Sequence, residues 1–239
     1  MNARQFGATC TVPMRALKAI LFDLDGTLID SLADLATAIN RMLALKGYPP
    51  RELALFPKFI GEGMRQLVER ALPEEARQPE NVQACLEEYV RQYEQCWHEQ
   101  TRVYEGMPEV LAALKAQGYQ VGCISNKAHG FTQLCCDHFF GAGAWEVVFG
   151  QREGVPRKPA PDAAHEAAAR LGVAVEECAY VGDSGIDMQF ANAAGMVAVG
   201  VTWGFRSEAE LRENGAQVLL NRPQDLLALL LGQPGLAAP

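Results

Sequence analysis

The chain of 239 residues can form one large domain or two unequal ones, and its 49% of hydrophobic residues exclude a disordered or fibrous protein. The net charge of −8 argues against broad binding of nucleic acid, and no apolar run is long enough to cross a membrane. The seven cysteines include no CxxC pair and no zinc-like spacing with histidine, so we expect reduced thiols and a cytoplasmic protein.

Short apolar runs alternate with helical patterns over most of the chain. The first run, Leu17–Asp23, is followed by a glycine turn and predicts a buried strand. Further strands are predicted at Tyr119–Ile124, Trp145–Phe149, Cys178–Val181, Val197–Val201 and Gln217–Leu220. Helices are predicted at Met107–Gln117, Ala128–His138, Pro161–Leu171, Ile186–Ala194, Ser207–Asn214 and Pro223–Leu231. This alternation predicts an α/β fold, a Rossmann-like open parallel sheet with helices on both faces.

The alternation stops after the first strand and resumes only near residue 104. Apolar residues between these points repeat at i, i+3, i+4 and i+7, which is typical of helices with one apolar face. We therefore expect a small all-helical cap domain at 31–103, inserted into an α/β core domain made of 17–30 and 104–239. Residues 1–16 are expected to be a loose N-terminal extension, within which Met14 is an alternative start.

Polar residues follow the predicted strands at their carboxyl ends, where open α/β sheets bind ligands. Asp23 and Asp25 end the first strand, and strand alternation points both side chains the same way. Other predicted strands end with Ser125, Asn126, Lys127 and Asp183. Lys158 lies just before a predicted helix and Asp187 at the start of another. Carboxylates that converge repel one another, so a cation is expected among them, and hard oxygen ligands favour Mg²⁺.

Carboxylates, a metal and a lysine together suit phosphoryl transfer. A carboxylate can attack phosphorus once the phosphate charge is neutralised, and the product is an aspartyl-phosphate. A second carboxylate can protonate the leaving oxygen and then accept a proton from the water that hydrolyses the intermediate. The aspartate pair of the first strand provides one residue for each of these two roles.

The strings DLDGTLIDS, SNK, RKPAPD and GDSGID occur in this order and resemble the four motifs of haloacid dehalogenase-like phosphatases. The resemblance covers nearly the whole chain from about Leu17. It implies that Asp23 is the nucleophile and Asp25 the acid/base. It also implies that Ser125 donates a hydrogen bond to the phosphate and that Lys158 bridges the phosphate and the nucleophile.

The same resemblance implies a Mg²⁺ site and a class of substrate. The implied metal ligands are Asp23, Asp183, Asp187 and the backbone carbonyl of Asp25. The segments FIGEGMRQLVERAL, VYEGMPEVLAALKAQGY and VTWGF look like those of phosphoglycolate phosphatases, although Ser125 stands where that group more often has threonine. We expect hydrolysis of a small phosphate monoester, first of all 2-phosphoglycolate, with a sugar phosphate or pyrophosphate as the alternative.

Further residues are expected to bind substrate, and each has an ordinary alternative. The expected set is Thr27, Asn126, Lys127, Gly61 and Arg65. Gly61 and Arg65 open a cap helix whose free N–H groups could meet an anion, but a flexible loop with a solvated arginine is equally consistent. Lys127 could equally be a surface charge. Acids such as Asp183 and Asp187 near a helix start could cap the helix instead of binding metal.

The sequence argues against two other classes of protein. A calcium-binding loop is excluded because Gly26 and Asp34 occupy the wrong positions of its pattern. A receiver-like signalling protein would store phosphate on Asp23, but it has no use for Asp25 or for a helical cap. The expected partner is thus a small phosphorylated metabolite, not nucleic acid or membrane, and the protein is expected to be a monomer or homodimer.

Overall fold

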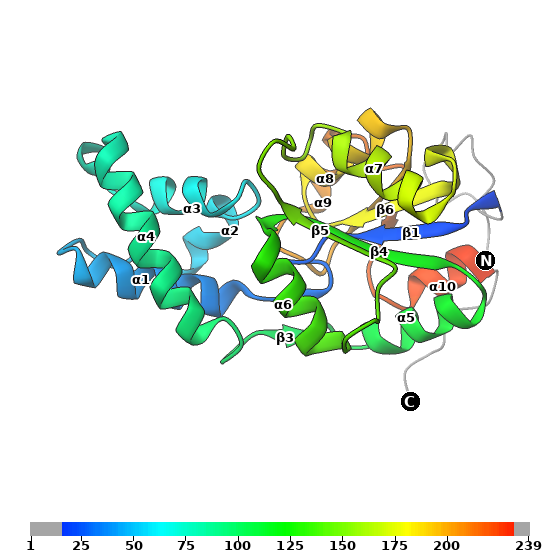
Figure 1. Ribbon diagram of the computed structural model, residues 1–239, viewed down its shortest axis with the longest axis horizontal. Coiled ribbons are helices and arrows are strands. Elements are labelled where there is room, and N and C mark those ends of the chain that lie inside the picture. The colour runs from blue at the N-terminus through cyan, green and yellow to red at the C-terminus, as the bar shows by residue number, and fades with distance from the viewer. Residues whose placement is uncertain (1–15, 232–239) are drawn as a thin grey trace.

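A six-stranded sheet with the order β5-β4-β1-β6-β7-β8 lies at the centre of this computed structural model, which describes residues 16–231 (Figure 1). All neighbouring strands of this sheet are parallel. The strands are β1 (Ala19–Phe22), β4 (Gln120–Ala128), β5 (Val147–Gln151), β6 (Cys178–Gly182), β7 (Val197–Val201) and β8 (Val218–Leu220). The predicted fold class is confirmed. The predicted N-terminal extension, except for its last residue, lies outside the described residues.

Alternate side chains of the strands pack against different layers of helices. Ile20 and Phe22 of β1 belong to one apolar core, and Ala19 and Leu21 belong to the other. The first core also includes residues of α5 (Met107–Ala116), α6 (His129–Phe140) and α10 (Asp225–Leu231). The second includes residues of α7 (Asp162–Leu171), α8 (Gly185–Ala194) and α9 (Glu208–Glu213). Figure 1 shows these two sets on opposite faces of the sheet, which explains why β1 is apolar at every position.

The strand order reverses at β1. From β1 the chain passes to β4 and β5 on one side and then returns to β6 on the other side of β1. Ligands bind at such reversals, beyond the carboxyl ends of the strands. Asp23 follows β1 directly, so the topology puts this carboxylate at the centre of the edge that binds ligands.

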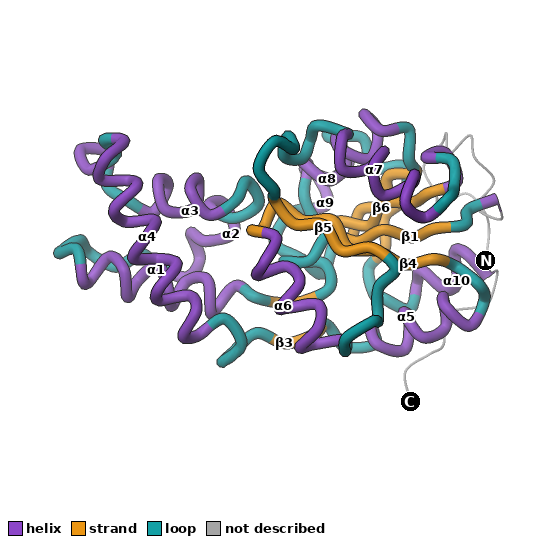
Figure 2. Tube along the Cα trace, in the orientation of Figure 1, coloured by secondary structure: helices purple, strands orange, loops and turns teal. Residues whose placement is uncertain are grey.

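A layer of helices interrupts the α/β pattern between β2 (Ile29–Asp30) and β3 (Arg102–Val103). Its helices are α1 (Leu32–Leu45), α2 (Phe56–Phe59), α3 (Met64–Ala71) and α4 (Pro79–Cys96). They stand apart from the strands of the large sheet (Figure 2). We call this layer the cap; its division from the core at residues 31 and 103 stays a prediction. None of the described helices has the length and apolar character needed to cross a membrane.

An antiparallel pair joins the two chain segments that connect the cap to the core. Ile29 of β2 pairs with Val103 of β3, and Asp30 pairs with Arg102. Sequence analysis did not predict these strands, because two residues are too few to give a periodicity.

A buried carboxylate ties the entry of the cap to its exit. Asp34 lies in the first turn of α1 and is 0% exposed. It accepts hydrogen bonds from the backbone N–H groups of Gln100 at 3.0 Å and Thr101 at 2.8 Å, and from the Thr101 hydroxyl at 2.7 Å. These bonds hold the two connecting segments side by side at the base of the cap.

Asp34→Asn replaces one of these acceptor oxygens by an NH₂ group that faces N–H donors. We expect the free energy of unfolding to fall by about 1.5–3 kcal/mol, because buried hydrogen bonds to a charged group are lost. Urea unfolding measures this change. Asp30→Asn is the control, since Asp30 is exposed and its substitution should cost less than about 0.5 kcal/mol. Equal stabilities of the two variants would contradict the anchoring role of Asp34.

Candidate active site

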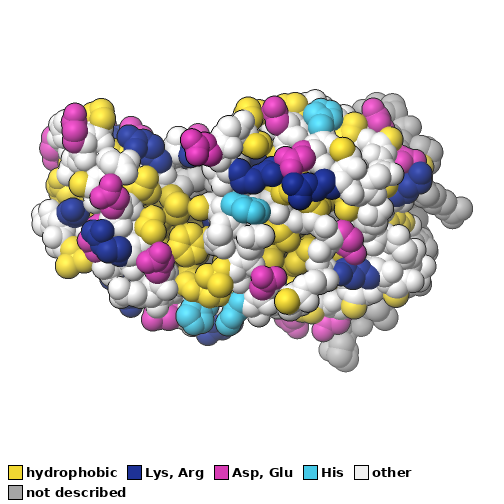
Figure 3. All heavy atoms as spheres, in the orientation of Figure 1, with side chains coloured by type: hydrophobic (Ala, Val, Ile, Leu, Met, Phe, Trp, Pro, Cys, Tyr) yellow, Lys and Arg dark blue, Asp and Glu magenta, His cyan; other side chains and the backbone are white. Residues whose placement is uncertain are grey.

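A cavity of about 50 Å³ lies where the cap meets the carboxyl edge of the sheet. Its core side is lined by predicted site residues from separate segments, namely Asp23, Asp25, Ser125, Asn126, Lys127 and Asp183. Gly61 of the cap also lines it. The face of the molecule in Figure 3 has hydrophobic side chains gathered where the two parts meet. The fold thus brings most of the predicted residues together around one space.

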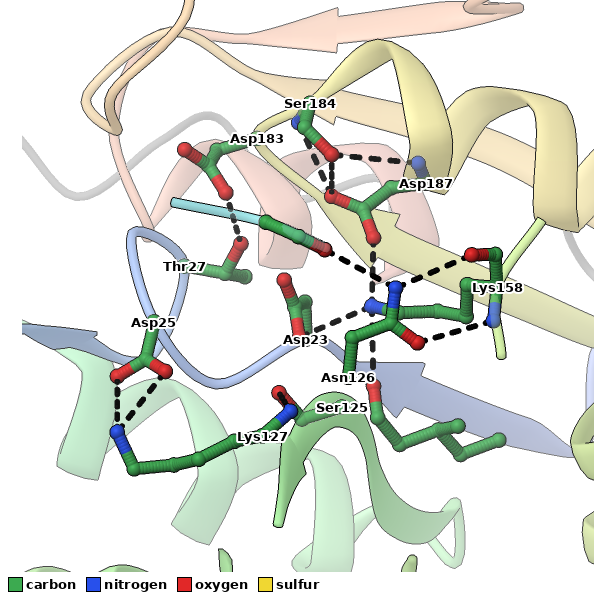
Figure 4. Close-up of polar contacts among 12 residues, drawn as sticks. Asp23, Asp25, Thr27, Ser125, Asn126, Lys127, Lys158, Asp183, Ser184 and Asp187 are labelled. Atoms are coloured by element: carbon green, nitrogen blue, oxygen red, sulfur yellow. Dashed lines mark hydrogen bonds and ion pairs between the residues drawn. The ribbon is translucent and has the colours of Figure 1, made fainter. Parts of the chain in front are cut away.

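Lys158 joins two of the carboxylates. Its Nζ atom lies 3.0 Å from Oδ1 of Asp23 and 2.7 Å from Oδ1 of Asp187 (Figure 4). It also donates a hydrogen bond of 2.7 Å to the Tyr180 hydroxyl. Burial acts to lower the pKa of Lys158, but Asp187 and Asp23 outweigh this effect and raise the pKa above its ordinary value. The lysine is therefore a permanent positive charge beside Asp23.

Asp23 itself is a buried carboxylate with a shifted pKa. Burial raises the pKa of Asp23 to about 6, while Lys158 acts to lower it and Asp187 to raise it further. The negative form of this side chain thus depends on the cations beside it. A carboxylate held in this way, at the centre of the edge that binds ligands, is suited to act as a nucleophile.

Asp25 belongs to a second ion pair. Both of its carboxylate oxygens lie 3.1 Å from Nζ of Lys127, and the Ser31 hydroxyl donates to Oδ1 at 2.6 Å. Figure 4 shows this pair apart from the pair of Asp23 and Lys158. Lys127 is 7% exposed, so its position is not that of a surface charge. The two aspartates have different surroundings, which is the condition for two different roles in one reaction.

Asp23, Asp183 and Asp187 offer carboxylate oxygens that all lie within 4.8 Å of one another. Together with Asp25 they bring four carboxylates to the site, and the two lysines described above balance only half of this charge. Burial, Asp187 and Asp23 raise the pKa of Asp183 well above its ordinary range, which indicates that a cation beside it would be favourable. A divalent cation with hard oxygen ligands, such as Mg²⁺, fits this donor set.

The structure engages Asp187 in other bonds as well. Its Oδ1 atom pairs with Lys158, and its Oδ2 atom accepts hydrogen bonds from the Ser184 N–H at 3.0 Å and the Ser184 hydroxyl at 2.6 Å. Ser184 is the N-cap of α8 and forms a capping box with Asp187. The helix-capping alternative therefore occurs in the structure, and a role of Asp187 as a direct metal ligand stays a prediction.

Thr27 and Asn126, both predicted to bind substrate, use their polar groups within the protein. The buried Thr27 hydroxyl donates to Oδ1 of Asp183 at 3.4 Å. The amide of Asn126 donates to the carbonyl oxygens of Gly61 at 3.0 Å and Lys158 at 3.1 Å, and accepts from the Lys158 N–H at 2.9 Å. Asn126 thus links the cap to the segment that carries Lys158.

Three core side chains hold the cap through three consecutive backbone carbonyls. The bonds run from Arg206 to Ile60 at 2.8 Å, from Asn126 to Gly61 at 3.0 Å and from Arg157 to Glu62 at 3.1 Å. The roles of Arg157 and Arg206 could not be predicted from the sequence, because an isolated arginine carries no local signal of what it will contact. These bonds hold the cap loop against the cavity.

Arg65, also predicted to bind substrate, does not line the cavity. Met64 and Leu67 of α3 face it, and Arg65 follows Met64 by about 100° around the helix axis. The Arg65 guanidinium instead donates to the Gln83 side chain at 3.1 Å in an exposed position. Arg206 of the core is the arginine that lines the cavity. The geometry therefore does not support a direct contact between Arg65 and a substrate in this arrangement.

The family of the chain follows from a match to the model of "Haloacid dehalogenase-like hydrolase", which spans residues 20–201. The chain belongs to the haloacid dehalogenase-like hydrolase family. A phosphoglycolate phosphatase of Pseudomonas putida is 33% identical over 93% of this chain and 80% of that protein. One of Xanthomonas campestris pv. campestris is 34% identical over 89% of this chain and 96% of that protein.

Solved structures agree with this assignment. One from Lactobacillus delbrueckii subsp. bulgaricus has a TM-score of 0.85 and 30% identity, and covers 90% of this chain and 99% of its own. A predicted phosphoglycolate phosphatase from Haemophilus somnus has a TM-score of 0.83 and 27% identity, over 91% of this chain and 99% of its own. The predicted family, its phosphoglycolate phosphatase-like subgroup and the predicted class of enzyme, a hydrolase of the phosphatase type, are confirmed.

Gly26 and Gly118 form a matched pair for testing the environment of Asp183. Both have left-handed backbones, with φ of +88° and +85°. A Cβ atom at Gly26 would overlap the Asp183 carboxylate, whereas nothing lies within 4 Å of one at Gly118. We expect Gly118→Ala to lose about 1–2 kcal/mol of unfolding free energy, because alanine is strained there. Gly26→Ala should lose more, because its Cβ also displaces the buried Asp183 carboxylate.

Only Gly26→Ala should also lose most of the phosphatase turnover, because Asp183 must move. Urea unfolding and phosphate release, measured on both variants, separate the two effects. If both variants retained the same turnover, the position of Asp183 would not matter to catalysis.

Proposed function

We propose that this protein is a Mg²⁺-dependent phosphatase that hydrolyses a small phosphate monoester, first of all 2-phosphoglycolate, through an aspartyl-phosphate on Asp23. The observation that carries the proposal is the contact of 3.0 Å between Asp23 and the buried Lys158 at the point where the strand order reverses. A nucleophile and a fixed positive charge are thereby side by side where a phosphate would bind.

In the first half of the reaction, Asp23 attacks phosphorus. Lys158 lies against the attacking carboxylate and lowers the repulsion between it and the phosphate. The Ser125 hydroxyl lines the cavity and accepts a hydrogen bond from the Lys127 N–H at 3.3 Å. Its own proton is therefore available for a phosphate oxygen, which supports the predicted role of Ser125 as a donor.

In both halves, Asp25 is the group proposed to move a proton. It donates a proton to the leaving oxygen and later accepts a proton from the water that attacks the intermediate. Lys127 and Ser31 fix the direction of its carboxylate by the contacts given above. Because these partners are separate from those of Asp23, one aspartate can exchange protons while the other forms the covalent bond.

Mg²⁺ would be held by Asp23, Asp183 and the backbone carbonyl of Asp25, with Asp187 as a further candidate ligand. When bound, it supplies positive charge that offsets both the carboxylates and the phosphate. Among the described residues Thr27 and the Phe205 N–H bind Asp183, at 3.4 Å and 2.7 Å, and these contacts orient its carboxylate.

The names of the relatives support a small substrate. Relatives named phosphoglycolate phosphatase support 2-phosphoglycolate in particular. A sugar phosphate or pyrophosphate is the second candidate within this chemistry. A receiver-like role would require Asp23 to keep its phosphoryl group, whereas Asp25 and the cap favour turnover.

The test is release of phosphate from 2-phosphoglycolate, sugar phosphates, nucleotides and pyrophosphate, with Mg²⁺ and with EDTA. We expect turnover only with Mg²⁺ and the highest kcat/KM for 2-phosphoglycolate. Asp23→Asn should lower kcat by at least about 1000-fold, since removal of a nucleophile has effects of this size or larger. Asp30→Asn, an exposed carboxylate nearby, should retain full activity.

Activity that survives Asp23→Asn would contradict the assignment of Asp23 as the nucleophile. A higher kcat/KM for another substrate would contradict 2-phosphoglycolate as the substrate but not the proposed mechanism. A single turnover per enzyme would favour the receiver-like alternative.

A further inference from the structure

The cap side of the cavity is apolar except for two tyrosines. Leu35 of α1 and Met64 and Leu67 of α3 line it, together with Tyr89 and Tyr93 of α4. No charged side chain of the cap is among the described residues that line this space. The charged residues are on the core side, which is lined by Asp23, Asp25, Lys127, Asp183 and Arg206. The cap side therefore faces the part of the substrate beyond its phosphate.

The hydroxyl groups of both tyrosines lack partners. Tyr89 is 0% exposed and Tyr93 is 1% exposed, and neither hydroxyl has a hydrogen-bond partner within residues 16–231. A buried hydroxyl without a partner is unfavourable, because it loses its bonds to water and gains none in the protein. Phenylalanine would fill the same space without this loss, so each hydroxyl requires an explanation other than packing.

The rings are held in place without the hydroxyls. Tyr89 and Tyr93, one turn apart on α4, are stacked with their centroids 5.7 Å apart, and Tyr93 meets the Phe131 ring edge-on at 5.0 Å. Nζ of Lys127 lies 4.7 Å from the centre of the Tyr93 ring, which is a cation–π contact. The packing of the two rings therefore fixes the positions of their hydroxyl oxygens.

Both phenols are hydrogen-bond donors at neutral pH. Burial is the main cause that raises the pKa of each hydroxyl well above its ordinary value. Lys127 lies beside Tyr93, but Asp25 pairs with Lys127 and is itself among the causes that raise the pKa of both phenols. Donors that lack acceptors favour a ligand that offers acceptor oxygens, and a carboxylate offers two of them.

We propose that Tyr89 and Tyr93 are specificity-determining residues whose hydroxyls donate hydrogen bonds to the carboxylate of the substrate, beyond its phosphate. This inference rests on the proposed function and extends it from the phosphate to the rest of the substrate. The unpartnered hydroxyls are then donors that find their acceptors when a phosphorylated carboxylic acid binds. A small apolar wall with two donors excludes larger, hydroxyl-rich sugars, which need acceptors as well as donors.

The experiment uses Tyr89→Phe and Tyr93→Phe, which remove one oxygen and keep each ring. The substrates are 2-phosphoglycolate and ethyl phosphate, which has the same length but no carboxylate. We expect each variant to raise KM for 2-phosphoglycolate by about 10- to 100-fold, as the loss of a buried hydrogen bond to a charged group does. KM for ethyl phosphate and inhibition by inorganic phosphate should not change.

Tyr48→Phe is the matched control, because Tyr48 is a cap tyrosine outside the cavity lining whose hydroxyl accepts from Asn81 at 3.0 Å. It should leave both substrates unaffected. Thermal unfolding of the free protein gives a second readout. Tyr89→Phe and Tyr93→Phe should keep or raise Tm, because an unpartnered hydroxyl is removed, whereas hydroxyls with a structural role would lower Tm on removal.

The outcomes separate this inference from the proposed function. If the unaltered protein hydrolyses neither substrate, both are overturned. If it prefers 2-phosphoglycolate but the tyrosine variants leave KM unchanged, or raise it equally for ethyl phosphate, the inference alone is overturned. A lowered Tm with unchanged preference between the substrates would assign the hydroxyls to the fold.

Discussion

The mutual repulsion of four carboxylates at one edge of the sheet, three of them buried, is the constraint on which this structure depends. Parallel strands end at this edge, so acids that are far apart in the sequence meet there. Lys158 lies between Asp23 and Asp187, and Lys127 holds Asp25, so each lysine offsets part of the charge. The charge that remains favours a divalent cation, and an incoming phosphate is in turn favoured by the cation and the lysines. The proposed chemistry is therefore a consequence of how the site balances its charge.

The cap converts this charged edge into an enclosed site. Three consecutive cap carbonyls accept hydrogen bonds from core side chains, and one of these, Asn126, also binds the backbone of Lys158. Asn126 therefore links the cap loop directly to the segment that carries Lys158. The cap contributes apolar side chains and two phenols to the cavity, whereas the core contributes the charged groups. We infer that the core sets the reaction and the cap sets the substrate, with Tyr89 and Tyr93 as the polar contacts of the cap.

Sequence alone predicted the fold and seven of the seventeen residues that line the cavity, because their signals are local. An apolar run followed by DLDGT indicates a strand, a turn and two acids in one short segment, and the structure puts Asp23 and Asp25 at that place. The direction of Arg65 could not be predicted, since it depends on which side of α3 faces the core. The apolar repeat of the cap predicts helices with one apolar face, and Tyr89 and Tyr93 are buried in the structure, but such a repeat carries no information on whether a buried hydroxyl has a partner. Such patterns do not predict the tertiary contacts of single polar groups.

Detection of the covalent intermediate on Asp23 is the decisive experiment for the proposed mechanism. The enzyme would be quenched during turnover of 2-phosphoglycolate with Mg²⁺ and treated with borohydride, which reduces an acyl phosphate to an alcohol. We expect peptide mass spectrometry then to find homoserine at position 23, only when substrate is present, and unmodified aspartate at position 25. Steady release of phosphate with both aspartates unmodified throughout, or modification at Asp25 instead, would contradict this mechanism.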